Sequence, residues 1–187
     1  MFGLDARIAL AIFAVIAVVA GTAIVISMDS TRAKALAQEL SETGKAIESI
    51  CYDLRADLYP SLIQPSPKNA FTALFDSSVL KDTDNLRGKW LGPYIRATST
   101  TSRYGEMMIE ARREKHADTC EMGAPCYLWL TYAQVKKGIA TEVNSVIDGE
   151  HEEDPSNHGR IQWNDGGDTV TLSYQAAKTL TYTGDTY

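Results

Sequence analysis

The sequence is poor in the residues that build most catalytic and cofactor sites. It holds 3 histidines and 3 cysteines, and they do not form a Cys-x-x-Cys-His haem attachment motif. It also lacks a glycine-rich phosphate-binding loop and a nucleophile elbow. The formal net charge of −6 gives a nucleic-acid role no electrostatic support. We therefore expect no enzyme activity, no required cofactor and no nucleic-acid partner.

What the chain does have is one long uncharged run near its amino-terminal end. No charged residue occurs from Ile8 to Ile26, and only Gly21 and Thr22 interrupt its Ala, Ile, Val, Leu and Phe residues. A helix of this length spans roughly 28 Å, close to the hydrocarbon thickness of a bilayer. The run is too long for a signal peptide, and Asp5 precedes it. It predicts a membrane-inserted segment, residues 1–27.

Asp5 needs an explanation, because an unpaired ionisable group near a spanning helix costs a few kcal/mol. The first residues resemble the mature amino terminus of type IV pilins and type II secretion pseudopilins. In that family an apolar or aromatic first residue is followed four positions later by an acidic residue, usually Glu, and Met1 and Asp5 fit these positions. The resemblance implies that a prepilin peptidase removes a basic leader and that Met1 is N-methylated. It also implies that Asp5 pairs with the Met1 amino group of an adjoining subunit.

Three features depart from the family pattern. Asp5 is one methylene shorter than the usual Glu, so the same ion pair requires a closer approach. Arg7 stands where most relatives carry an apolar or hydroxyl residue, and it either shares the Asp5 charge or reaches towards lipid headgroups. Many pilins have a proline near position 22. Here Gly21 and Thr22 are predicted to loosen the helix on assembly; the alternative is that the helix simply continues.

An amphipathic pattern follows the uncharged run. Small and apolar residues recur at three- and four-residue steps, which indicates one buried helical face: Ala33, Leu36, Leu40, Gly44, Ile47, Cys51, Leu54 and Leu58. Pro60 cannot continue a helix and disfavours it in Tyr59. We predict one helix from about residue 3 to residue 58, with residues 28–59 packed on a globular head of residues 60–187.

The sequence of the head predicts an α+β domain. Residues 105–113, 126–135, 160–165 and 168–176 are predicted strands, and residues 139–150 a helix. Gly166 and Gly167 favour a hairpin between the last two strands. The Trp90–Tyr94 turn is similar to a loop of pseudopilins and related pilins. The expected fold is therefore a pilin-like lollipop, a long helix packed on an antiparallel sheet.

The cysteines and the acidic residues of the head suggest two further features. Gly and Pro between Cys120 and Cys126 allow a small disulfide loop, which we favour over a zinc site, while Cys51 is predicted to be a buried apolar residue. An acidic stretch, residues 148–155, could supply oxygen ligands to a structural calcium ion, as related pseudopilins do. The candidate ligands are Asp148, Asp154, Asp165 and Asp168. The alternative, which we favour, is a solvated acidic loop.

Together these patterns favour a structural subunit that assembles with copies of itself into a type IV pilus-like extracellular filament. The resemblance implies the bacterial inner membrane as the precursor's location, and the prepilin peptidase and assembly machinery as partners. The main alternative is a pseudopilin of a type II secretion system, located in a periplasmic pseudopilus. A third hypothesis, from another class, is a membrane-tethered binding domain that never polymerises.

Overall fold

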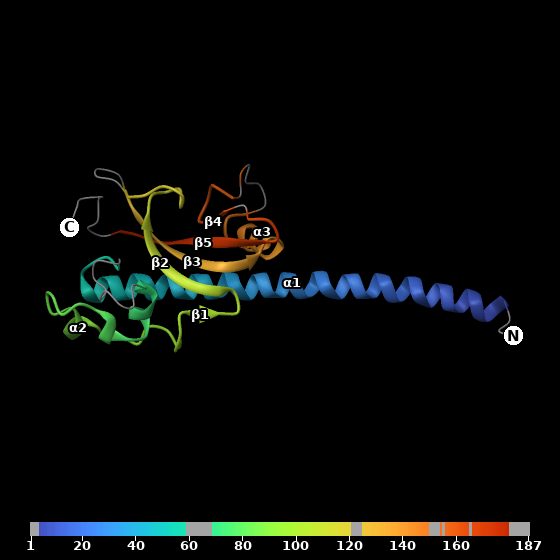
Figure 1. Ribbon diagram of the computed structural model, residues 1–187, viewed down its shortest axis with the longest axis horizontal. Coiled ribbons are helices and arrows are strands. Elements are labelled where there is room, and N and C mark those ends of the chain that lie inside the picture. Colours follow the sequence, from blue (N-terminus) through green and yellow to red (C-terminus); the bar gives the residue numbers. More distant parts are fainter. Residues whose placement is uncertain are drawn as a thin grey trace.

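The fold is organised around one long helix at the amino-terminal end. The computed structural model describes residues 4–58, 69–120, 125–149, 154, 156–164 and 166–179, with the side chains of residues 4–8 and 19–27 left aside. Helix α1, Leu4–Leu54, has 51 residues. The remaining elements gather around its carboxyl-terminal half, and its amino-terminal half extends away from them (Figure 1). The α+β class and the long amino-terminal helix predicted from the sequence are confirmed.

The second half of α1 packs through the predicted face. All seven residues of the predicted stripe that carry a side chain are at most 3% exposed: Ala33, Leu36, Leu40, Ile47, Cys51, Leu54 and Leu58. Gly44, the eighth position, lies against Tyr174, whose ring carbon Cε1 would be 3.0 Å from a Cβ atom placed there. The absence of a side chain at Gly44 therefore lets the sheet approach the helix closely.

The helix ends earlier than predicted. Its last residue is Leu54, and Arg55 adopts a left-handed conformation with φ of 54°. The Ala56 amide donates to the Cys51 carbonyl, which closes the final turn. The predicted end near residue 58 was wrong. We expected Pro60 to end the helix, but the left-handed conformation of Arg55 ends it four residues earlier than predicted. Leu58 is nevertheless buried, outside the helix.

The head contains a five-stranded sheet in the order β1-β2-β3-β5-β4, in which all neighbours are antiparallel. The strands are β1 (Thr101–Ser102), β2 (Gly105–Arg112), β3 (Tyr127–Lys136), β4 (Ile161–Asn164) and β5 (Thr169–Lys178). Helix α3, Lys137–Ile147, follows β3 directly. The predicted strands, the β4–β5 hairpin and the helix after β3 are thus confirmed.

A segment without long elements connects α1 to the sheet. It contains η2 (Ala70–Leu74), η3 (Ser77–Val79) and α2 (Leu86–Lys89). The Trp90 indole donates to the Ala73 carbonyl at 2.8 Å, and the Tyr94 hydroxyl donates to Asp53 Oδ2 of α1 at 2.7 Å. Burial and this carboxylate raise the pKa of Tyr94 to about 12. The Trp90–Tyr94 turn therefore anchors the segment to α1 and to the core.

The cysteines are arranged as predicted. Cys120 and Cys126 form a disulfide in the connection between β2 and β3. The Cys126 carbonyl accepts hydrogen bonds from the backbone amide and the hydroxyl of Thr179, both at 3.0 Å. Cys51 is a buried free thiol, and burial raises its pKa to about 12.

Candidate assembly interface

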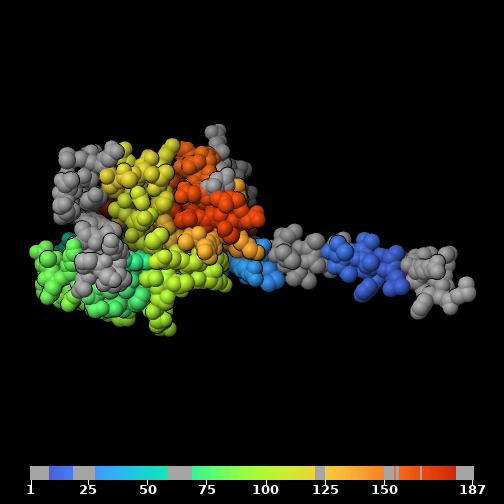
Figure 2. All heavy atoms as spheres, in the orientation of Figure 1, coloured from blue at the N-terminus to red at the C-terminus, as the bar shows by residue number. Residues whose placement is uncertain are grey.

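The first candidate for a functional surface is the part of α1 that extends beyond the head. Residues 9–18 are exposed throughout, and Figure 2 shows this stretch standing clear of the head. Its large apolar side chains are 56% to 70% exposed: Leu10, Ile12, Phe13, Val15, Ile16 and Val18. Burying one such side chain is worth about 1.5 to 3 kcal/mol. The described head residues leave this surface uncovered.

The direction of these side chains shows what kind of cover they require. Successive residues of an α-helix are rotated by about 100°, so positions 10, 12, 13, 15, 16 and 18 point to all sides of α1. A single partner helix buries only one stripe of such a surface. A helix that is apolar all round is covered instead by lipid or by several neighbouring helices.

The residues that carry the family resemblance lie at the edge of the described part. Met1 is outside it, and of Asp5 and Arg7 only the backbone, within α1, is described. Their predicted pairing therefore stays a prediction. Helix α1 continues through Gly21 and Thr22 in this single chain, and their loosening on assembly also stays a prediction. Among the described residues, none of the helices combines the length and apolarity of a membrane span.

Two of the four candidate calcium ligands have other contacts. Asp148 Oδ2 accepts the Ile161 amide at 2.8 Å and so joins the end of α3 to β4. Asp154 accepts hydrogen bonds from Asn157 and, more weakly in its effect, from Ser156, and these bonds lower the pKa of its carboxyl. Asp168 is exposed, and Asp165 lies outside the described residues. Within the described residues, no three Asp, Glu, His or Cys side chains come together as metal ligands. Calcium binding at these residues therefore stays a prediction.

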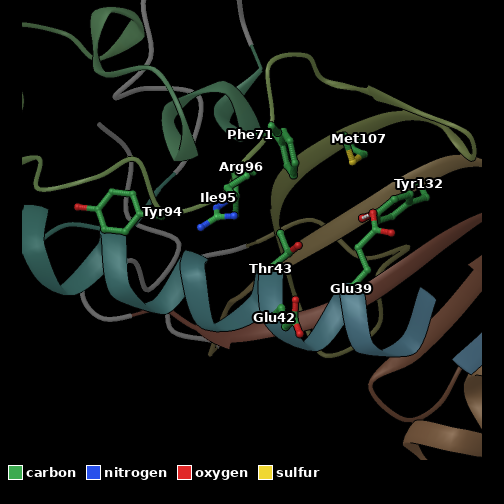
Figure 3. A pocket seen from close by; sticks show the side chains of 10 residues that line it. Glu39, Glu42, Thr43, Phe71, Tyr94, Ile95, Arg96, Met107 and Tyr132 are labelled. Carbon is green, nitrogen blue, oxygen red and sulfur yellow. Dashed lines mark hydrogen bonds between the residues drawn. The ribbon is translucent and has the colours of Figure 1, made fainter. Parts of the chain in front are cut away.

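The head has a cleft of about 380 Å³ beside α1. Figure 3 shows Glu39 and Glu42 on the helix side of this cleft, with Phe71 and Tyr132 across from them. The Tyr132 hydroxyl donates to Glu39 Oε1 at 2.8 Å, and the Gln38 amide donates to Glu42 Oε1 at 2.8 Å. The carboxylates are thus held in place along one exposed side of α1, close to the head's core.

Sequence reasoning did not find the groups that line the head's clefts. A second cleft, of about 630 Å³, brings together Arg32, Arg103 and Lys136 from three distant parts of the chain. None of these basic residues belongs to a local motif. Only the pairing of the strands and the packing of α1 place them side by side, so no signal in the sequence identified them.

The chain matches no family model, no curated protein and no solved structure.

Proposed function

We propose that this protein is a structural subunit of a type IV pilus-like filament, held in a membrane before assembly. The observation that carries the proposal is the apolar stretch of α1 at residues 9–18, exposed on all sides and extended beyond the head. Lipid would cover this surface in the single subunit. Neighbouring α1 helices would cover it in a filament core, with the heads outside.

The amino-terminal pattern supports the same proposal. The uncharged run from Ile8 to Ile26 provides a span of suitable length, and Asp5 precedes it. In the proposed filament, Asp5 pairs with the Met1 amino group of a neighbour and sets the axial step between subunits. The carboxylate would otherwise stay unpaired in an apolar environment, and this penalty favours incorporation next to another subunit.

The proposal is tested by comparing filament yield between two acidic-residue variants in the bacterium that makes the protein. Asp5→Ala is expected to reduce the protein recovered in sheared filaments about tenfold or more, since a few kcal/mol of ion-pair stabilisation is lost at every subunit contact. Asp82→Ala is the matched control, because Asp82 is an exposed acidic residue of the head. It is expected to leave the yield unchanged. Both variants must reach wild-type levels in the membrane fraction.

Mass spectrometry of the mature amino terminus provides an independent measurement. N-methylated Met1 is the expected result. Equal filament yields for the two variants, or no filaments at all with an unmodified amino terminus, would favour the membrane-tethered binding domain instead. Short filaments that stay in the periplasm and are required for protein secretion would identify a pseudopilin.

A further inference from the structure

A basic cleft lies where α1 leaves the head. Arg32 comes from α1, Arg103 from the β1–β2 turn and Lys136 from the end of β3, and the cleft between them measures about 630 Å³. Gln134 and Thr169 complete its polar lining, and Tyr104, whose hydroxyl is buried in the core, adds only its ring. Among the described residues, no carboxylate lines this cleft. Guanidinium, ammonium, amide and hydroxyl groups are all donors that suit a phosphate.

The walls of the cleft are held by the sheet. The backbone amide of Gln134 donates to the Tyr104 carbonyl at 2.8 Å, and Lys136 pairs with Thr169 across β3 and β5. The Arg103 guanidinium lies over the Tyr104 ring, 4.8 Å from its centroid. These contacts hold Arg103 and Lys136 on the same end of the sheet.

The acidic residues near the cleft lie outside its lining. Asp29 forms an exposed ion pair of 3.3 Å with Arg32, which leaves most of the five guanidinium donors of Arg32 available. Glu142 accepts the Ser30 hydroxyl at 3.2 Å. Asp168 has an exposed side chain outside the lining, and its carbonyl accepts the Lys137 amide. The lining itself therefore stays cationic.

The position of the cleft along α1 fits the surface of a bilayer. In Figure 1, α3 and the β1–β2 turn lie at the end of the head from which α1 extends. Arg32 follows Ile26, the end of the uncharged run, by six residues, or about 9 Å of helix. Headgroups extend about 5 to 8 Å beyond the hydrocarbon on each side. Helical side chains lean towards the amino terminus, which brings the Arg32 guanidinium within reach of lipid phosphates.

We propose that the cleft formed by Arg32, Arg103 and Lys136 binds the phosphate of anionic phospholipid headgroups and holds the head against the membrane before assembly. This inference depends on the membrane insertion contained in the proposed function. Binding at the cleft sets the orientation of the head relative to the bilayer. Extraction of the subunit into a filament then requires these phosphate contacts to be released.

The test uses the full chain in nanodiscs of phosphatidylcholine, and in discs with about a third phosphatidylglycerol. Hydrogen exchange is measured on peptides covering 100–106 and 132–140. We expect slower exchange in the anionic discs, and we expect the difference to disappear when salt is raised from about 0.1 M to about 1 M. A parallel arm adds inorganic phosphate to the phosphatidylcholine discs.

Variants assign the effect to the cleft. The protection ratio is the exchange rate of these peptides in phosphatidylcholine discs divided by the rate in anionic discs. One Lys or Arg near an anionic surface changes association about fivefold, so Arg103→Gln and Lys136→Gln are each expected to reduce this ratio by about that factor. Arg103 also stacks on Tyr104, so Arg103→Gln alone could act through a change in folding. Lys136→Gln removes a charge without removing this contact, and the same effect in both variants is therefore due to the charge. Lys89→Gln is the matched control, because α2 lies at the opposite end of the head (Figure 1), and it is expected to leave the ratio unchanged.

Each other outcome of the nanodisc experiment overturns the proposal in a distinct way. Equal exchange in the two kinds of disc excludes lipid recognition by the cleft. Protection by inorganic phosphate alone identifies a site for free phosphate, and protection that rises with the number of chains per disc identifies a second copy as the occupant. Failure of the chain to enter either disc contradicts the proposed function as well. Failure of Asp5→Ala to affect filaments contradicts the proposed function without affecting the cleft.

Discussion

The Tyr132 hydroxyl donates a 2.8 Å hydrogen bond to the Glu39 carboxylate and so connects the middle of the sheet to α1. Tyr132 is fully buried on β3, whereas Glu39 is only half-buried. Burial, together with the nearby Glu39 charge, raises the pKa of Tyr132 well above its ordinary value. The phenol therefore stays a hydrogen-bond donor across the whole working pH range.

Replacing this phenol tests its contribution to stability. We expect Tyr132→Phe to lower the free energy of unfolding by about 1 to 2 kcal/mol, because a hydrogen bond to a charged group is lost while Glu39 can regain water. Urea unfolding of the full chain in mild detergent, followed by circular dichroism, provides the measurement.

Tyr104 is the matched control for this change. Its hydroxyl is buried and has no hydrogen-bond partner among the described residues, and its ring packs against that of Tyr132 at 6.2 Å. Removing an unsatisfied buried hydroxyl removes a desolvation penalty, so Tyr104→Phe is expected to be neutral or stabilising. Both variants keep the ring, so equal destabilisation would mean that the loss of a buried hydroxyl group, and not the hydrogen bond to Glu39, is responsible.

Gly44 is predicted to be intolerant of side chains. Tyr174 lies against it and is held by Arg160, whose Nη2 donates to the tyrosine hydroxyl at 2.6 Å. The ring cannot move away without breaking that contact, so Gly44→Val should lower the free energy of unfolding by about 1 to 3 kcal/mol. The same urea titration measures it.

Gly138 provides the comparison within another helix. It lies in the first turn of α3, and apart from its chain neighbours and the backbone of that helix no described atom is within 4 Å of a Cβ placed there. Gly138→Ala is expected to stabilise the protein by about 0.5 to 1 kcal/mol, because alanine restricts the unfolded chain. A stabilising Gly44→Val variant would show that the helix and sheet are less closely packed than the structure indicates.

Glu110 is expected to make stability depend on pH in the acid range. It lies 3.2 Å from the His116 ring and 3.2 Å from the Arg112 guanidinium, and its hydrogen bond with His116 is the main cause that lowers its pKa to about 2. A lowered folded pKa stabilises the protein above the ordinary value of 4.5. This stabilisation is lost as pH falls from about 5 to about 2.

Glu110→Gln isolates the contribution of this carboxylate. The difference in unfolding free energy between wild type and Glu110→Gln should be largest near neutral pH and should decrease towards about pH 2, as followed by urea unfolding at several pH values. A difference that stays constant with pH would show that the Glu110 charge is not responsible.

The disulfide is expected to contribute to stability through the unfolded chain. Cys120 and Cys126 are 6 positions apart, and closing a loop of this size is worth about 2 kcal/mol. The double variant Cys120→Ser/Cys126→Ser should lose about that amount in urea. Adding a reductant should destabilise the wild type similarly and leave the double variant unaffected; an effect of reductant on both would point to a different cause.

Cys51 should be inert towards thiol reagents in the folded protein. It is 3% exposed, and burial raises its pKa to about 12, so neither access nor thiolate is available. Ellman's reagent is expected to find about one thiol per chain after denaturation and almost none before. Rapid labelling of the native chain would show that the face of α1 around Cys51 opens.

Several features of this protein follow from the sequence because they are set locally. The periodicity from Ala33 to Leu54 predicts the buried face of α1, and Gly166 with Gly167 predicts the β4–β5 hairpin. Composition alone marks the uncharged run. Such features depend on residues within a few positions of each other, where helical and strand repeats determine which side chains share a face.

Other features were decided only by the tertiary structure. The order β1-β2-β3-β5-β4 brings Arg103 and Lys136 to the same cleft as Arg32. The packing of α1 on the sheet brings Glu39 within hydrogen-bond distance of Tyr132, which lies 93 positions further along the chain. The end of α1 depends on the left-handed conformation of Arg55, and no proline or glycine directly beside Arg55 predicts it. These contacts arise from strand register and from close packing between distant segments, and neither leaves a periodic pattern in the chain.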